Sequence, residues 1–124
     1  MIDFTNAVFV KLRQVPDENF AEMIMPIFAA GEKILSSFQA IRDGVVFTDK
    51  RIIAINIEGF TGKKKDFTSL PYGKIQVFSV TTPGMLDLDS ELELYFTGLG
   101  TVRFEFESRV DVTGISRIIS EHIL

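Results

Sequence analysis

The fold is decided by the stretch Gly44-Val45-Val46-Phe47-Thr48-Asp49-Lys50-Arg51-Ile52-Ile53-Ala54-Ile55-Asn56. Two runs rich in β-branched residues flank the short polar turn Asp49-Lys50, which is the pattern of a β-hairpin. In the second run isoleucines recur at alternate positions, while Ile52 and Ala54 make the opposite face partly apolar. A strand that is apolar on both faces lies in the centre of a sheet or beneath a helix. We therefore expect this hairpin to be the central pairing of a sheet.

Length and composition indicate one globular domain. The chain has 124 residues, 46% of them apolar, and its 12 Phe with no Trp predict that Phe supplies much of the core. The absence of Cys excludes disulfides, thiolate catalysis and Cys-ligated zinc, and it is compatible with the cytoplasm as the expected location. A net charge of −4 opposes general binding to nucleic acid or to anionic membranes. We see neither a signal peptide nor an apolar run long enough for a membrane-spanning helix.

Two helices are predicted before the sheet. Apolar side chains recur with helical spacing over residues 3–15, and Pro16 should end that helix. A second helical segment is predicted over residues 17–30, with a kink or an early end at Pro26. We therefore divide the chain into an N-terminal helical segment, residues 1–30, and a domain over residues 31–124, which together form one structural unit.

The second helical segment carries a broad apolar face. Such a face most often packs on the core of its own domain, and the alternative is that it docks on another subunit. We keep both interpretations. The residues of this face that we take as a candidate interaction surface are Phe20, Ile24, Ile27 and Phe28.

Seven strands are expected between residues 32 and 107, where the apolar period shifts toward two. A turn at Asp43-Gly44 should separate the first two strands. The last two strands alternate most clearly, and their register should place Arg103 opposite Glu91 or Glu93. The expected ranges are 32–42, 45–48, 51–57, 66–70, 74–81, 91–96 and 101–107.

A helix is predicted over residues 108–124. Ser108 to Asp111 has capping-box spacing, with Asp in the reach-back position. The apolar stripe that runs from Val112 to Ile123 must be buried, most simply against the open end of a curled sheet.

Several motifs resemble those of bacterial pleckstrin-homology domains. The central hairpin, from Ile41 to Ile53, resembles their phenylalanine-threonine-polar-lysine-arginine-leucine hairpin. Three later stretches resemble, in order, their glycine-threonine-glycine-lysine-lysine loop, their serine-isoleucine-proline-tyrosine segment and their aspartate-leucine-aspartate lead into a strand. These stretches are Gly59-Phe60-Thr61-Gly62-Lys63-Lys64, Ser69-Leu70-Pro71-Tyr72-Gly73-Lys74-Ile75 and Asp87-Leu88-Asp89-Ser90-Glu91-Leu92. The match as a whole covers about residues 17 to 124.

The resemblance implies a mainly β fold with helices. It implies a pleckstrin-homology-like, curled antiparallel sheet or barrel of seven strands, closed at one end by the C-terminal helix, with helices at the N-terminus. It also implies homo-oligomers, possibly ring-like, and no known activity. Eukaryotic lipid-binding relatives carry a basic cluster between their first two strands, whereas the connection here, Arg42-Asp43-Gly44, is short and of mixed charge.

Side chains suited to catalysis or metal binding are few. His122 is the only His, and we expect it to be solvated or to interact with the dipole of the last helix. We therefore expect no catalytic residue, no cofactor and no metal site. The acidic run Asp87, Asp89, Glu91 and Glu93 lacks the glycine and the bidentate Glu of an EF-hand. The favoured roles are therefore a turn cap for Asp89 and solvated side chains for the glutamates.

Lys63, Lys64 and Lys65 offer a different candidate. With Lys50, Arg51 and Lys74 they could form a basic patch that contacts phosphates. The alternative, which the net acidity of the chain favours, is that they solubilise a hairpin tip or protect a strand edge.

We interpret the chain as a non-enzymatic interaction or scaffold module that self-associates through its N-terminal helices or its strand edges. A further protein partner remains open, and no nucleic-acid partner is expected. The alternative is a peripheral binder of anionic lipid headgroups through the loop of residues 63–65. A third interpretation is that the protein is an enzyme, which would need a deep pocket lined by convergent polar groups.

Overall fold

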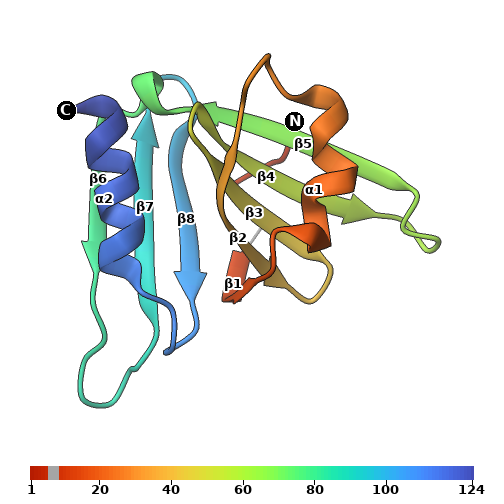
Figure 1. Cartoon of the computed structure of the whole chain (residues 1–124). Helices are drawn as coiled ribbons and strands as arrows, with labels where there is room; N and C mark the ends of the chain where they lie inside the picture. Colours follow the sequence, from red (N-terminus) through yellow and green to blue (C-terminus); the bar gives the residue numbers. More distant parts are fainter. Residues whose placement is uncertain (6–8) are drawn as a thin grey trace.

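A curled sheet with a helix against each of its two parts makes up the computed structural model, which describes residues 1–5 and 9–124 (Figure 1). Eight strands are formed by these described residues. In chain order the elements are β1 (Phe9–Val15), α1 (Glu18–Ile24), the 3₁₀ turn η1 (Met25–Ile27), β2 (Ile34–Ala40), β3 (Asp43–Thr48), β4 (Arg51–Glu58), β5 (Lys64–Pro71), the 3₁₀ turn η2 (Tyr72–Lys74), β6 (Val77–Thr81), β7 (Ser90–Phe96), β8 (Gly100–Phe106) and α2 (Val112–Ile123).

The strand order is β5-β4-β3-β2-β1-β8-β7-β6, so β5 and β6 are the two edges of the sheet. All neighbouring strands are antiparallel except β1 and β8, which run parallel. The central hairpin is confirmed as β3 and β4, with Val46 opposite Ile53 and Phe47 opposite Ile52. β4 lies between β3 and β5, as its two apolar faces predicted.

The helix predicted over residues 3–15 is wrong, because residues 9–15 form β1. The register of β1 against β8 shifts between Phe9 and Leu12, and Lys11 has a positive φ of 55°. This irregularity places the buried Phe9 and Leu12 three positions apart, which imitates the spacing of a helix. The expected contributions of Ala7 and Val8 lie outside the described residues. Among the described residues up to residue 30, which are 1–5 and 9–30, only α1 and η1 are helical.

The second predicted helix is confirmed, and Pro26 lies in η1 directly after it. Phe20 and Ile24 are buried against β3 and β4, in a small core that includes Ile53 and Ile55. Gly44 gives the Phe20 ring its space: a Cβ on Gly44 would lie 2.7 and 2.9 Å from the two Cε atoms of that ring. The apolar face of α1 therefore packs mainly on its own domain.

The main core fills the concave side of the sheet. Rings of Phe38 and Phe106 meet edge-on at 5.1 Å, and Phe38 also packs edge-on against Phe47 at 5.8 Å. Phe47 belongs to β3 and Phe106 belongs to β8, and these strands lie on opposite sides of β1. Phe side chains therefore join the two parts of the sheet, and Phe supplies much of the core, as the composition predicted. The α2 helix closes this core with Val112, Ile115 and Ile119.

Three local predictions need correction. The turn between β2 and β3 lies at residues 41 and 42, because Asp43 and Gly44 are already part of β3. Asp111 is not the reach-back residue of a capping box: it is the N-cap of α2, and its side chain accepts a hydrogen bond from the Gly114 amide. The sheet also has one strand more than expected, since β1 joins the seven predicted strands.

Candidate interaction surfaces

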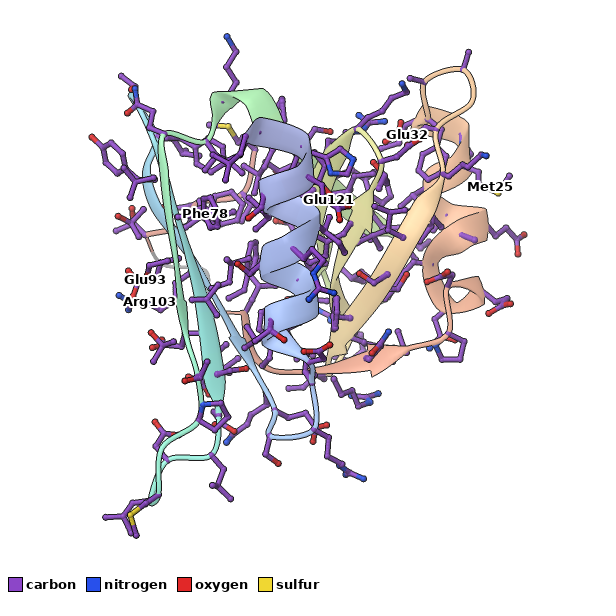
Figure 2. All side chains as sticks on the ribbon, turned by 60° about the vertical axis from the view of Figure 1, so that its left-hand side comes forward. Met25, Glu32, Phe78, Glu93, Arg103 and Glu121 are labelled. Atoms are coloured by element: carbon purple, nitrogen blue, oxygen red, sulfur yellow. The ribbon has the colours of Figure 1, made fainter. Side chains whose placement is uncertain are left out.

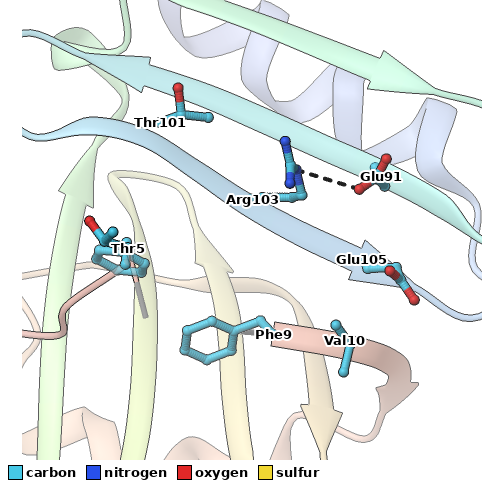
Figure 3. Close-up of a pocket in the computed structure, with 8 residues that line it drawn as sticks. Thr5, Phe9, Val10, Glu91, Thr101, Arg103 and Glu105 are labelled. Carbon is cyan, nitrogen blue, oxygen red and sulfur yellow. Dashed lines mark ion pairs between the residues drawn. The ribbon is translucent and has the colours of Figure 1, made fainter. Parts of the chain in front are cut away.

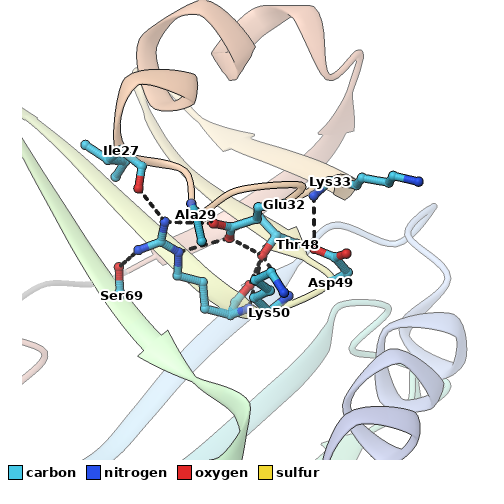
Figure 4. Close-up of polar contacts among 9 residues, drawn as sticks. Ile27, Ala29, Glu32, Lys33, Thr48, Asp49, Lys50 and Ser69 are labelled. Carbon is cyan, nitrogen blue, oxygen red and sulfur yellow. Dashed lines mark hydrogen bonds and ion pairs between the residues drawn. The ribbon is translucent and has the colours of Figure 1, made fainter.

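Arg51, a member of the predicted basic patch, is engaged within the fold by Ile27, Glu32 and Ser69, which Figure 4 labels. Its Nη2 donates to the carbonyl of Ile27 at 2.7 Å and to Glu32 Oε1 at 2.9 Å, and its Nε donates to Glu32 Oε2 at 3.0 Å. Its Nη1 donates to Ser69 Oγ at 2.9 Å. Glu32 also accepts a hydrogen bond of 2.6 Å from the hydroxyl of Thr48. Arg51 is therefore a structural residue that joins β4 to the segment after α1.

Burial alone would raise the pKa of Glu32, but the hydrogen bonds from Arg51 and Thr48 outweigh it, so the pKa lies below its usual value. The Glu32 side chain is fully buried, whereas that of Arg51 is 20% exposed. A buried carboxylate held in this way is a fixed ion pair, and the pair is not free to bind a ligand.

Lys63, Lys64 and Lys65 are exposed where β5 begins. Lys64 pairs with Glu58 across the hairpin at 3.7 Å. Beside this loop lies the β2–β3 turn, because Arg42 Nη1 donates to the carbonyl of Gly59 at 3.0 Å.

Each of these two tips carries an apolar side chain in water. Ile41 is 91% exposed, Phe60 is fully exposed, and Ile41 has a positive φ of 50°. A β-branched residue in that backbone region is strained, and strain of this kind collects at functional sites. The two tips thus combine lysines with unburied apolar groups, which amphipathic membrane surfaces also do.

The candidate surface on α1 is divided by the structure. Phe20 and Ile24 are buried and unavailable, Phe28 is partly buried in the same small core, and Ile27 remains exposed in η1. Met25, the residue that precedes Pro26, also points into solvent (Figure 2). What stays accessible is the short η1 turn, which is a small part of the surface predicted from the sequence.

The β6 edge presents a different surface. Its sequence, Val-Phe-Ser-Val-Thr, carries no charge, and β7 is its single strand neighbour. Phe78 and Val80 pack toward the core, while Val77 is 62% exposed beside the exposed ring of Tyr95. An edge strand that lacks charge offers unpaired backbone groups to another strand.

The β6–β7 loop, residues 82–89, extends beyond the ends of its two strands (Figure 1). Met85, Leu86 and Leu88 are exposed along it. Asp87 stabilises the loop as a turn, because its carbonyl accepts from the Gly84 amide at 2.7 Å and its side chain accepts from the Asp89 amide at 3.1 Å. The turn-capping role that we predicted for Asp89 therefore belongs to Asp87.

The other acids of the run are also engaged. Lys11, projected from the irregular part of β1, pairs with Asp89. The hydrogen bond from Lys11 lowers the pKa of Asp89, whereas burial, followed by the contact with Asp89, raises the pKa of Glu105. Arg103 lies 3.5 Å from both Glu91 and Glu93, which confirms the predicted register (Figure 2).

A cavity of about 400 Å³ lies between β1 and β8 (Figure 3). Phe9 and Val10 line one side, and Glu91, Arg103 and Glu105 line the other. Arg103 is the one cation among its described lining residues, and Glu91 and Glu93 already hold it. The described lining therefore lacks a free cation that could fix an anionic ligand.

A second cavity, of about 540 Å³, lies beside η2. Its apolar wall comes from the end of β5 and from the β7–β8 turn, with Leu70, Pro71, Phe96 and Leu99. Lys74 carries its one charged side chain within the part of the chain that the structure describes, so the cavity is apolar with a basic rim.

His122 is exposed on α2 and stacks on the ring of Tyr72 at 4.6 Å. Its Nδ1 lies 2.7 Å from the carbonyl oxygen of Ile118, one turn earlier in the helix. Within residues 1–5 and 9–124 no three potential metal-ligating side chains come together. The described helices also include none that is long and apolar enough to span a bilayer.

The curled sheet closed by a C-terminal helix is the fold of pleckstrin-homology-like domains. The chain matches the family model described as "Bacterial PH domain" over residues 3–123, and it therefore belongs to that family. It is similar to the uncharacterized protein YjqA of Bacillus subtilis, with 41% identity over 101 residues that cover 80% of this chain and 81% of YjqA.

Two solved structures have the same fold. One is a DUF1696 family protein with a pleckstrin-homology domain from Shewanella loihica, with a TM-score of 0.81, 35% identity, and coverage of 93% of this chain and 99% of that chain. The other is a pleckstrin-homology domain from Shewanella amazonensis, with a TM-score of 0.68, 35% identity, and coverage of 96% and 93%.

Proposed function

We propose that this chain is a non-catalytic interaction module that associates with further copies of itself through the edge of β6. The observation that carries the proposal is the uncharged sequence of this edge strand. The opposite edge, β5, carries Lys64, Lys65 and Asp66 at one end and Pro71 at the other. Charges and proline are the usual means by which sheet edges avoid pairing, and β6 has neither.

Antiparallel pairing of β6 with β6 of a second copy would continue the sheet across a two-fold axis. With the middle residue, Ser79, on the axis, Val77 of each copy lies opposite Thr81 of the other. The pairing would also cover part of the exposed Val77 and Tyr95 side chains. A ring, which the family resemblance implied, would need the β5 edge in addition.

Sedimentation of the wild type over a range of concentrations tests the proposal. Ser79→Lys should shift the equilibrium toward monomer, because it places two lysines side by side at the axis. A mixture with Ser79→Glu should restore pairing between unlike copies. Thr101→Lys is the matched control, since Thr101 is exposed on the same sheet but away from its edges. A wild type that stays monomeric up to hundreds of micromolar would overturn the proposal.

A second candidate is binding of anionic lipid headgroups by the tips around Ile41 and Phe60. It is favoured by the two exposed apolar side chains beside Lys63, Lys64 and Lys65. Co-sedimentation with phosphatidylserine vesicles tests it: Phe60→Ser and a triple Lys→Ala variant should each weaken binding. Vesicles of phosphatidylcholine alone are the control. Equal binding of the triple variant and the wild type would rule out the lysines.

The non-catalytic part of the proposal is supported by the engagement of Arg51, Arg103 and Glu32 within ion pairs of the fold. A cytoplasmic location also belongs to the proposal, and it rests on the absence of Cys, which suits a reducing compartment.

A further inference from the structure

We propose that the cavity beside η2 binds a small organic acid, with the apolar body of the acid inside the cavity and its carboxylate at Lys74. This η2 cavity has a volume of about 540 Å³, which is within the usual range for sites of small ligands. Its described lining comes from one chain, so the site does not depend on how copies associate. The proposed function gives these residues no role.

The η2 cavity lies where two turns of the chain approach each other. On one side β5 ends at Pro71, and η2 then leads the chain toward β6. On the other side is the β7–β8 turn, in which Leu99 lies between Gly98 and Gly100. These glycines have φ values of 83° and 96°, which glycine adopts without strain. Residues of both turns line the cavity.

Hydrogen bonds hold the walls of the η2 cavity in place. Tyr72 is buried at the start of η2, and its hydroxyl donates to the carbonyl of Thr48 at 2.7 Å. The amide of Ile75 closes the 3₁₀ turn on the Tyr72 carbonyl at 3.1 Å. The next amide, that of Gln76, donates to the carbonyl of Tyr95 at 2.9 Å. A cavity that is formed in advance does not have to be ordered by its ligand, which favours binding.

The interior of the η2 cavity is apolar. Leu70 and Phe96, which are buried members of the main core, line it together with the partly buried Leu99. Asp and Glu are absent from its described lining. The aliphatic or aromatic body of a ligand can therefore leave water here without meeting a negative charge.

Lys74 supplies the free cation of the η2 cavity. Its side chain is exposed at the last residue of η2, and no ion pair within residues 1–5 and 9–124 engages it. The ammonium group of Met1, which also lies at the cavity, is already bound to Asp66 at 3.0 Å. A single ammonium suits one carboxylate, and the exposed side chains of Gln76 and Thr97 can donate further hydrogen bonds to it.

The charge of the η2 cavity decides between classes of ligand. A phosphate group is usually held by several Lys or Arg side chains, whereas this cavity offers one. The lysines of residues 63–65 are at the opposite end of β5 and cannot contribute (Figure 1). The cavity therefore fits a monoanion with an apolar body, such as a medium-chain fatty acid. The terminal carboxylate of a peptide has the same chemistry, and the experiment below separates it from a free acid.

Octanoate is the probe for a direct test. When the isotope-labelled wild type is titrated with octanoate, the amide chemical shifts of Gly73, Thr97 and Leu99 should change first. 1-Octanol, which has the same apolar body without the charge, should bind roughly tenfold more weakly. Equal affinity for the two compounds, or no change at these residues at millimolar octanoate, would overturn the proposal.

Substitutions separate the charge from the cavity. Lys74→Met keeps an aliphatic stem, so it should lower the affinity for octanoate roughly tenfold and leave that for 1-octanol unchanged. Lys74→Glu should reverse the preference, so that octylamine binds more tightly than octanoate. Thr97→Trp adds a large ring to the cavity lining and should weaken both octanoate and 1-octanol. Both positions are exposed, so the fold should tolerate these changes.

Lys63→Met is the matched control, because Lys63 is an exposed lysine beyond the other end of β5. It should leave the affinity for octanoate unchanged. A loss as large as that of Lys74→Met would show that octanoate binds lysines without using the cavity, and the proposal would be wrong.

A short acetylated peptide that ends in leucine presents the same carboxylate on a chain end. If this peptide shifts the cavity signals and octanoate does not, the occupant is a peptide and the proposal fails. Self-association is tested separately by sedimentation. A wild type that is monomeric but binds octanoate at Lys74 would overturn the proposed function and leave the η2 site standing.

Discussion

The guanidinium of Arg51 lies 2.9 Å from a carboxylate oxygen of Glu32, and this pair fastens the segment after α1 to the first residue of β4. The same guanidinium also reaches Ile27 and Ser69, so one side chain joins η1, β4 and β5. The lysine-arginine step of the central hairpin thus contributes to the domain in two ways. Lys50 is solvated in the turn, and Arg51 holds the small core closed.

Removal of one partner from the Arg51–Glu32 pair should strongly destabilise the fold. We expect Arg51→Met to lower the free energy of unfolding by about 3 kcal/mol, because Glu32 would keep its charge in a buried place without its cation. Urea denaturation measures the change. Arg103→Met is the matched control: Arg103 pairs with two glutamates but is largely exposed, so its loss should cost below about 1 kcal/mol. Equal losses in both variants would show that the Arg51 pair contributes no more than a surface contact.

The same pair predicts a dependence of stability on pH. The folded pKa of Glu32 lies below its value in the unfolded chain, which is about 4.3. Its contribution is therefore complete above that value and is lost as the pH falls through the lower, folded pKa. In urea titrations at a series of pH values, the wild type should lose stability toward acid more steeply than Glu32→Gln does. Parallel curves would contradict this account.

Gly44 should be intolerant of a side chain. Since a Cβ there would lie within 3 Å of the Phe20 ring, we expect Gly44→Ala to destabilise the fold by about 1–3 kcal/mol through overpacking. A double-mutant cycle identifies the cause, because Phe20→Leu removes the ring that the new methyl group meets. Gly44→Ala should cost less in the Phe20→Leu background than in the wild type. Additive losses would place the strain elsewhere.

In contrast to the substitutions above, replacement of Ile41 should stabilise the fold. Its φ of 50° is unfavourable for a β-branched residue, and at 91% exposure its side chain buries little. Ile41→Gly should therefore raise the free energy of unfolding by about 1 kcal/mol. If the hairpin tips bind lipid, the same variant should bind phosphatidylserine vesicles more weakly. A drop in stability would show that the backbone at this turn is relaxed around Ile41.

The hairpin, the final helix and the register of the last two strands could be predicted because their patterns are local. Apolar residues at the successive positions from Ile52 to Ile55 of β4 indicate that both faces of the strand are covered. β1 could not be predicted in this way. Its irregularity at Lys11 changes the spacing of the buried residues, and its partner β8 lies at the far end of the sequence.

The candidate surfaces were harder to predict than the strands. Phe20 and Ile24 have the same amphipathic pattern whether they cover their own sheet or a partner, and the space left by Gly44 decides for the sheet. Conversely, the sequence of the β6–β7 loop predicted only an ordinary connection between strands and gave no sign that Met85, Leu86 and Leu88 would be exposed. Their exposure depends on where the loop projects, which a sequence pattern does not encode. The lack of charge in β6 was the one signal that could have identified the edge beforehand.

The position of β1 in the sheet affects how the protein can fold during its synthesis. Phe9 of β1 pairs with Phe104 of β8. During synthesis β1 therefore cannot form its pairing with β8 until β8 has left the ribosome. Until then β2 alone can hold it, through the contacts of Arg13, Gln14 and Val15. Pairings between such distant parts of a chain form slowly. The β1–β8 pairing therefore forms last. Folding during synthesis can complete the central hairpin but not the domain.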